Sequence, residues 1–227
     1  MKKKVFYTEL AYILGLLAIA WGTACMERVD FGVSMVVAPA YILHLKISEF
    51  LPFFSFGMAE YTLQAIILFL MMIILQKVKL SYFFSFVTVI LYGFMLDGAI
   101  AMAVLIPLNG VFEKYIFYIV GMLICSMGVS LVFHTYISPE AYEMFVKEVS
   151  AKFNIDIHKF KTAYDCTSCL ISIALSFLFF GLWHFEGIKL GTVFCALANG
   201  SLIGLSTKLF EKIWIFEDRF SFRKYFD

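Results

Sequence analysis

Residues 80–106 read LSYFFSFVTVILYGFMLDGAIAMAVLI, and this stretch decides the fold of the chain. Asp97 is its only charged residue. An α-helix of about 20 apolar residues crosses a hydrocarbon core about 30 Å thick. The stretch is therefore predicted to be a transmembrane helix, and the rest of the chain shows how many such helices accompany it.

Five further apolar stretches have near-spanning length, at residues 9–26, 58–75, 115–134, 163–184 and 188–207. The chain is 62% apolar with a mean hydropathy of +0.89, and 15% of its residues are charged, against about 25% in soluble domains. Six spans occupy most of the 227 residues, so a soluble domain of about 50 residues or more is not expected. The prediction is an all-α polytopic membrane protein with six transmembrane helices.

Lysine and arginine gather in alternate loops. Residues 1–4, 77–79, 138–162 and those after 207 carry 14 of the 18 basic residues, and the opposite loops carry four. Because Lys and Arg are retained on the cytoplasmic side, both termini are predicted to be cytoplasmic. A basic N-terminus before an apolar run also fits a signal peptide. The bulky run has no clear cleavage site, which favours an uncleaved first helix in the plasma membrane.

A unit of about 100 residues is repeated. Pro39 matches Pro139 at an offset of 100, and Gln64 falls opposite Asp165 at 101. Further matches are Tyr41 with Tyr142, Lys46 with Lys147, Ser55 with Asp156 as helix N-caps, Gly32-Val33-Ser34 with Gly128-Val129-Ser130, and Tyr92-Gly93 with Asn199-Gly200. The sequence thus predicts a first repeat over 1–108, a second over 109–210 and a cytoplasmic tail over 211–227.

Each repeat contains a short proline-started segment, at residues 39–47 and 141–152. Ser138-Pro139-Glu140 has the pattern of an N-cap, an N1 proline and an acid near the positive helix end. The segment that follows alternates apolar and charged residues, as an interfacial helix does. Neither segment is long enough to span a bilayer, so both are predicted to be re-entrant or interfacial helices.

Three spans in each repeat are an odd number, so the second copy must enter the membrane with the opposite orientation. Inverted repeats of this kind are typical of transporters, whose substrate site lies near the midplane between the halves. Repeats also occur in membrane proteins that do not transport. The duplication therefore favours transport without establishing it.

Ionisable side chains inside a span cost several kcal/mol on insertion scales, so each needs an explanation. Asp97 precedes Gly98, a residue that allows close backbone approach. Its carboxylate either binds a cation, a proton or a cationic substrate group, or it caps the C-terminal portion of its helix or accepts a hydrogen bond from a neighbouring helix. Glu60 and Gln64 share one helix face, while Asp165 is predicted to open the fifth helix. The predicted substrate-binding set is Asp97, Gln64, Asp165, Asn199 and Glu60.

The five cysteines include a C-x-x-C pair, Cys166 and Cys169, which fits a redox pair. The charge rule places it on the reducing cytoplasmic side, where disulfides rarely persist. No zinc-ligand spacing, HExxH, Walker A loop, G-x-S-x-G or glycine-rich phosphate fingerprint occurs in the sequence. We therefore predict neither a cofactor nor a metal, and a non-enzymatic protein.

Several short motifs resemble the YczE/YyaS/YitT-like group of bacterial membrane proteins. The group's pattern is a proline-containing turn, a short amphipathic helix and a helix with an acidic residue. Similar elements here are Ser138-Pro139, a short helix, then Asn154-Ile155-Asp156-Ile157 and Asp165. Lys189-Leu190-Gly191-Thr192-Val193 before Asn199-Gly200, and Asp30-Phe31-Gly32-Val33-Ser34 with Asp97, are similar to its other elements. The resemblance covers about residues 25–207 and departs where Asn199-Gly200 replaces a usual Gly-Pro. It implies a bacterial plasma-membrane location and a suspected role in transport, export or metabolite production.

The leading hypothesis is a small secondary transporter or permease component that moves an unidentified small solute by alternating access. The alternative is an accessory or regulatory subunit, and a thiol enzyme is a third class. Expected partners are the lipid bilayer, the solute, and either a second copy or another membrane protein. Nucleic acid is not an expected partner, because the 27 Phe and 12 Tyr residues are expected to face lipid or fill the bundle.

Overall fold

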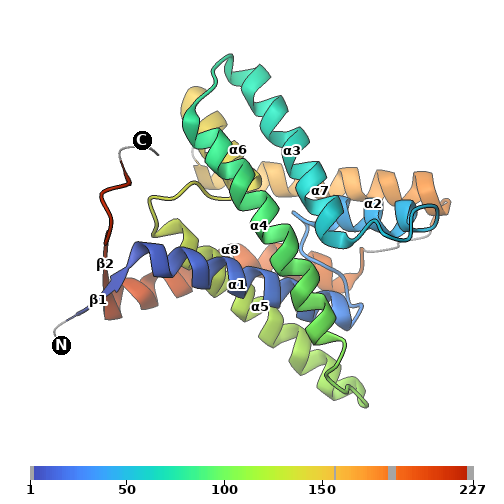
Figure 1. The fold of residues 1–227 in the computed structure, drawn as a ribbon. Helices are drawn as coiled ribbons and strands as arrows, with labels where there is room; N and C mark the ends of the chain where they lie inside the picture. Colours follow the sequence, from blue (N-terminus) through green and yellow to red (C-terminus); the bar gives the residue numbers. More distant parts are fainter. Residues whose placement is uncertain (1–2, 156, 184–187, 224–227) are drawn as a thin grey trace.

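The computed structural model describes residues 3–155, 157–183 and 188–223 of the chain. The described residues form eight α-helices and two short strands (Figure 1). The helices are α1 (Thr8–Arg28), α2 (Ala38–Ser48), α3 (Phe56–Leu75), α4 (Leu80–Ala103), α5 (Val111–Phe133), α6 (Ala141–Lys152), α7 (Ile157–Phe180) and α8 (Leu190–Ile213), and the strands are β1 (Lys4–Tyr7) and β2 (Trp214–Glu217). The predicted all-α architecture is confirmed.

Six of these helices are long and apolar enough to cross a membrane: α1, α3, α4, α5, α8 and the part of α7 from Ala163 to Phe180. They coincide with the six apolar stretches of the sequence, and the chain is a multi-pass membrane protein. The prediction for 163–184 is wrong at its end, because α7 stops at Phe180 and the next residue, Gly181, has a φ of +96°. The tail differs as well, since α8 runs to Ile213 and β2 follows it.

The short helices α2 and α6 lie where the prolines predicted them. The predicted cap at Ser138 is wrong: α6 begins at Ala141, with Glu140 at the N-cap and no side-chain cap hydrogen bond. The predicted cap at Ser55 is confirmed, because its side chain accepts a hydrogen bond from the Met58 backbone N–H at 3.1 Å. Its expected counterpart, Asp156, lies outside the described residues.

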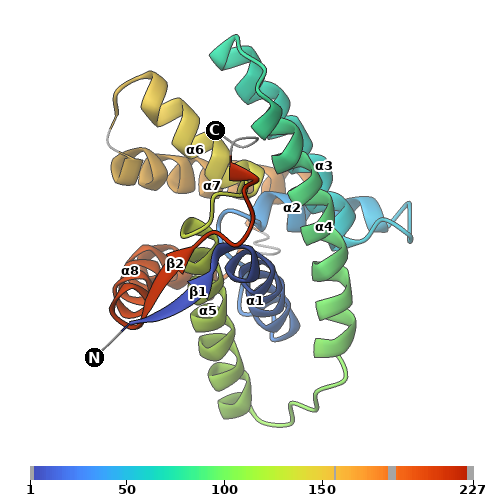
Figure 2. The same ribbon diagram turned by 60° about the vertical axis from the view of Figure 1, so that its left-hand side comes forward.

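Helices α1 and α5 cross at the centre of the molecule (Figure 2). A Cβ atom built on Gly22 would lie 2.5 Å from the backbone oxygen of Gly121, and one on Gly15 would lie 2.9 Å from that of Gly128. Small residues let two helix backbones approach this closely in a membrane, where packing rather than the hydrophobic effect drives association. These four glycines therefore allow the close packing of α1 on α5.

The remaining helices pack around this pair in matching ways. Helix α4 packs on α1 and α8 packs on α5, while α6 packs on α3 and α2 packs on α7. The predicted match of Gly32 with Gly128 is wrong: Gly32 lies in the turn after α1 with a φ of +105°, whereas Gly128 lies inside α5. The two copies of Gly-Val-Ser are thus unrelated in structure.

One pair of helices breaks this correspondence. Helices α3 and α4 pack together where a Cβ on Gly57 would lie 2.2 Å from the backbone oxygen of Gly93. No comparable packing joins α7 to α8 among the described residues, and Gly200 has no neighbour within 4 Å. Gly98, which the sequence marked for close approach, also has open space around it.

The two ends of the described chain meet in a small parallel sheet that hydropathy did not predict. β1 pairs with β2, so that Lys4 lies opposite Trp214 and Tyr7 opposite Glu217 (Figure 2). The ring of Phe6 stacks on Trp214 with centroids 4.7 Å apart. The Thr8 hydroxyl donates to Asp218 at 2.8 Å. Both ends of the chain therefore lie on the same side of the helix bundle.

Candidate functional site

A buried polar cluster joins α3 to the start of α6. Glu60 and Gln64 lie on one face of α3, and both are fully buried. Gln64 Nε2 donates to Glu60 Oε2 at 3.1 Å, and Gln64 Oε1 accepts from the Ala141 backbone N–H at 3.0 Å. The amide of Gln64 thus satisfies a free N–H at the start of α6 that Ser138 was expected to cap.

Tyr142 of α6 and Glu140, the N-cap of that helix, complete this cluster. The Tyr142 hydroxyl donates to Glu60 Oε2 at 3.0 Å, and Gln64 Nε2 lies 3.5 Å from Glu140 Oε2. Glu140 is 8% exposed. The second carboxyl oxygens, Oε1 of Glu60 and Oε1 of Glu140, are buried and accept no hydrogen bond from any described residue. We call Glu60, Gln64, Glu140 and Tyr142 the Glu60–Glu140 cluster.

The carboxyl group of Glu140 is held in its neutral form by its surroundings. The pKa of Glu140 is raised to about 8, chiefly by burial and also by the nearby charge of Glu143, while Gln64 and Lys161 act in the opposite direction. Desolvation penalises the charged form of a carboxyl group. Glu140 therefore changes its charge near neutral pH, where most carboxyl groups are ionised.

A second polar cluster lies between α6 and α7. Lys161 Nζ pairs with Glu143 Oε1 at 2.9 Å and with Asp165 Oδ1 at 3.2 Å. The three side chains are about one-fifth to one-quarter exposed. Asp165 was expected to open its helix, which is wrong, because α7 begins at Ile157 and Asp165 lies two turns further on. Its carboxylate instead serves as a partner of Lys161.

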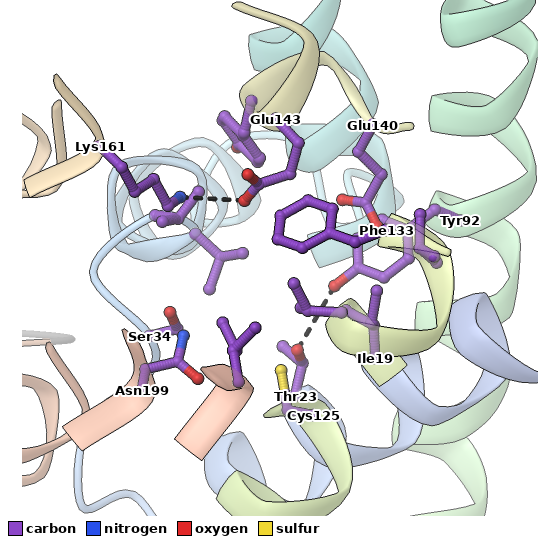
Figure 3. A pocket seen from close by; sticks show the side chains of 16 residues that line it. Ile19, Thr23, Ser34, Tyr92, Cys125, Phe133, Glu140, Glu143, Lys161 and Asn199 are labelled. Atoms are coloured by element: carbon purple, nitrogen blue, oxygen red, sulfur yellow. Dashed lines mark hydrogen bonds and ion pairs between the residues drawn. The ribbon is translucent and has the colours of Figure 1, made fainter. Parts of the chain in front are cut away.

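A cavity of about 60 Å³ lies between these clusters and the central helices. Its polar lining comprises Thr23, Ser34, Tyr92, Glu140, Tyr142, Glu143, Lys161 and Asn199. The apolar part of the lining comes from α1, α5, α8 and the segment before α2, mostly as valine and isoleucine side chains. Figure 3 shows the Glu143–Lys161 pair on one wall, Glu140 beside Tyr92, and Ser34 with Asn199 below them. One water molecule needs roughly 10–15 Å³, so the cavity has room for a few waters or one small polar group.

The predicted site residues are distributed unequally around this cavity. Asn199 lines it and accepts a hydrogen bond from the Ser126 hydroxyl at 2.9 Å. Glu60 and Gln64 do not line the cavity, but Gln64 contacts Glu140, which does, and also bonds Glu60. Asp165 does not line it either, but pairs with Lys161, which does. Asp97 does not line the cavity.

Asp97 instead caps α3. Its carboxylate accepts hydrogen bonds from the Ser55 hydroxyl at 2.5 Å and from the Gly57 backbone N–H at 2.8 Å. Of the explanations that the sequence left open, the hydrogen bonds match the acceptance of donors from a neighbouring helix and not a cap on the helix of Asp97 itself. Negative charge at a helix N-terminus is stabilising because it complements the free N–H groups and the helix dipole.

Replacement of Asp97 by alanine is therefore expected to destabilise the protein without altering the cavity. The loss of two hydrogen bonds to a charged group should lower the free energy of unfolding by about 1.5–3 kcal/mol. Asp97→Asn, which keeps an acceptor for the Gly57 N–H, should lose less. Thermal denaturation of the purified protein measures both effects, and an alanine variant as stable as the wild type would contradict this role.

Sequence reasoning missed Glu140, Tyr142, Glu143 and Lys161. The first three belong to the short helix that was predicted to lie at the interface, where charged residues face water. The useful signal was the crowding of four Lys residues and three Glu residues into residues 138–162. Cys166 and Cys169 are free thiols on α7, and neither lines the cavity.

Comparison with known proteins assigns the chain to a family. The sequence model of DUF6198, described as a family of unknown function, matches residues 6–208. No curated protein and no solved structure matches the chain. The chain therefore belongs to the DUF6198 family, and its resemblance to the YczE/YyaS/YitT-like group stays a prediction.

Proposed function

We propose that this member of DUF6198 is a small secondary transporter or permease component that moves a small solute by alternating access. The observation that carries the proposal is the polar cavity, which lies between helices of both halves of a membrane protein. Buried ionisable groups inside membrane bundles are costly, and where they occur they mark substrate or ion pathways. Glu140, Glu143 and Lys161 together line this cavity.

The helix packing supports two inverted repeats. Exchange of α1 with α5, α2 with α6, α3 with α7 and α4 with α8 converts each packed pair described above into the other. The glycines agree, because Gly15 and Gly121, like Gly22 and Gly128, are separated by 106 residues. Tyr92 donates to Thr23 between α4 and α1 at 3.4 Å, as Ser126 bonds Asn199 between α5 and α8.

The break in this correspondence supports alternating access. Helix α3 is packed on α4 through Gly57 and Gly93, while α7 and α8, their counterparts, lack comparable packing. In inverted-repeat transporters the two halves hold unlike conformations and exchange them during the cycle. The structure then represents one of two related states. In this state α3 is packed on α4 in the first half, while α7 is separated from α8 in the second.

We also propose that both termini face the cytoplasm of a bacterium. The paired strands β1 and β2 hold the two ends on one side of the bundle. The basic residues before α1 and after residue 207 lie at these ends, and Lys and Arg are retained on the cytoplasmic side. A reporter fused to either end should therefore have the same, cytoplasmic, location.

A ligand screen tests the proposal on the purified protein. A solute that binds the folded state at 100 times its dissociation constant should stabilise it by about 2.7 kcal/mol. Asn199→Leu, which fills the cavity, should abolish this stabilisation, whereas Asn109→Leu in an exposed turn should not. The ligand should then enter proteoliposomes that contain the wild type. A bound ligand with no uptake would contradict transport.

One observation favours the accessory-subunit alternative. Only 11% of the spanning window of α8 and 17% of that of α7 are buried, against 50% for α1. These apolar helices are free to contact either lipid or another membrane protein. An accessory subunit would show no ligand stabilisation and no flux alone, but would restore activity to a partner that co-purifies in fixed ratio.

A further inference from the structure

The two polar clusters that flank α6 differ in their balance of charge. In the cluster between α6 and α7, Lys161 supplies a positive charge to Glu143 and Asp165. In the Glu60–Glu140 cluster, two carboxyl groups meet only the neutral side chains of Gln64 and Tyr142. The first cluster carries its own cation, and the second does not.

The repeat makes this difference informative. Glu60 and Lys161 are separated by 101 residues, as are Gln64 and Asp165, and both pairs lie near the start of equivalent helices, α3 and α7. The position that holds a lysine ammonium group in one half thus holds a carboxyl group in the other. In the second half, the ammonium group of Lys161 neutralises the carboxylates of its cluster. In the first half, the equivalent charge has to come from a bound cation.

Two carboxyl oxygens of the Glu60–Glu140 cluster are buried without a hydrogen-bond donor among the described residues. Oε1 of Glu60 and Oε1 of Glu140 accept no hydrogen bond from any residue that the structure describes, although both are buried. Two buried carboxylates without a counter-charge pay a desolvation cost that their neighbours do not repay. A protonated carboxyl group instead supplies an O–H donor to a nearby acceptor, so one proton removes a charge and adds the missing hydrogen-bond donor.

We propose that Glu60 and Glu140, whose Oε2 atoms both face the amide nitrogen of Gln64, form a cation site that binds one exchangeable proton. Glu140 lines the cavity and Glu60 does not, so the proton enters and leaves through Glu140. It binds a carboxylate oxygen on entry and returns to the cavity on release, with no other bond changed. A divalent metal is a poorer occupant, because the described residues offer no group of three or more His, Cys, Asp or Glu side chains suited to one.

Titratable groups face this pair from every element packed around it. They are Tyr12 of α1, Tyr92 of α4, Cys125 of α5, Tyr142 and Glu143 of α6, and Lys161 and Tyr164 of α7. The tyrosines and the cysteine carry no positive charge in either protonation state. The positive charge of Lys161 favours the ionised form of Glu140, but its ammonium group forms ion pairs with Glu143 and Asp165 and donates no hydrogen bond to either free oxygen.

Infrared spectroscopy of the full-length purified protein measures this proton directly. A protonated carboxyl band should be present at about pH 5 and should disappear as the pH rises towards about 9, since the pair releases its proton. Glu60→Gln and Glu140→Gln should each weaken this band and change the pH at which it disappears, and Glu113→Gln, at the exposed start of α5, should leave it intact. A pH-dependent band unchanged in both cluster variants would overturn the site.

A sodium titration at constant pH tests the other monovalent occupant. If the site binds a proton, sodium should leave the melting temperature of the wild type and of Glu140→Gln unchanged relative to choline, a bulkier control cation. A sodium-dependent rise in melting temperature that both cluster variants lose would replace the proton by sodium. That result would overturn the assignment of the proton.

The role of this proton in coupling rests on the proposed function, and a separate measurement examines it. For a solute identified by the ligand screen, a pH gradient should drive uptake into wild-type proteoliposomes, and Glu140→Gln should abolish the response to the gradient. Gradient-driven uptake retained in Glu140→Gln would overturn the coupling role. A proton band without any flux would refute transport while leaving the cation site in place.

Discussion

Gly22→Leu is expected to prevent the central helices from packing and to produce the largest loss of stability of any single change considered. The new Cβ would lie 2.5 Å from the Gly121 backbone oxygen and 2.6 Å from the Cys125 backbone nitrogen. Backbone atoms of a helix cannot move aside as a flexible side chain can. Overpacking of a core typically lowers the free energy of unfolding by about 1–3 kcal/mol. Because Gly22→Leu forces α1 away from α5, its loss of stability should exceed this range.

Size-exclusion chromatography and thermal denaturation of the detergent-purified protein measure this loss. Gly204→Leu is the matched control, because Gly204 lies on an exposed face of α8 and has no neighbour within 4 Å. Its stability should change by no more than about 0.5 kcal/mol. Equal behaviour of the two leucine variants would show that the close contact of Gly22 with α5 is absent from the protein in solution.

Lys161→Met should give the second largest effect, by removing the positive charge that pairs with both Glu143 and Asp165. Loss of one partner from a buried ion pair costs about 3–5 kcal/mol, because the other charge stays buried. The Lys161 side chain is 24% exposed, which reduces the expected loss to about 2–3 kcal/mol. Lower pH should restore part of the stability, since protonation neutralises the two carboxylates that have lost their partner.

Thermal denaturation at several pH values checks this prediction. Lys147→Met, on the exposed side of α6, is the control and should behave as the wild type. The double variant Lys161→Met, Glu143→Gln should be more stable than Lys161→Met alone, because one of the two unpaired charges has gone. A single variant with the stability of the wild type at every pH would show that Lys161 is dispensable.

Much of the fold could be predicted because the membrane imposes a simple rule. A spanning helix needs a long apolar stretch, and each of the six stretches is a helix in the structure. The short helices followed from Pro39 and Pro139. The close packing of α1 on α5 did not follow, because it depends on Gly22 and Gly121 facing one another, and hydropathy does not specify facing residues. The pairing of β1 with β2 depends on residues from opposite ends of the chain.

Of the candidate site, only the polar residues within the apolar stretches could be predicted, because a polar residue stands out among apolar neighbours. Glu60, Gln64 and Asn199 were found in this way, and so was Asp97, whose partners at the start of the preceding helix, α3, could not be inferred. Glu140 and Lys161 lie in a charged segment, in which buried and exposed ionisable residues have the same appearance in sequence. Only the packing of α3 and α7 on α6 distinguishes them.

The parallel pairing of β1 with β2 also fixes an order of assembly. The bonded residues Thr8 and Asp218 are 210 positions apart, so synthesis of all six membrane helices precedes the pairing. Until then β1 presents an unpaired strand edge, a feature that favours non-native association. The pairing of β1 with β2 therefore comes after the synthesis of residues 214–217, and a nascent chain that stops short of Trp214 leaves β1 without its partner strand.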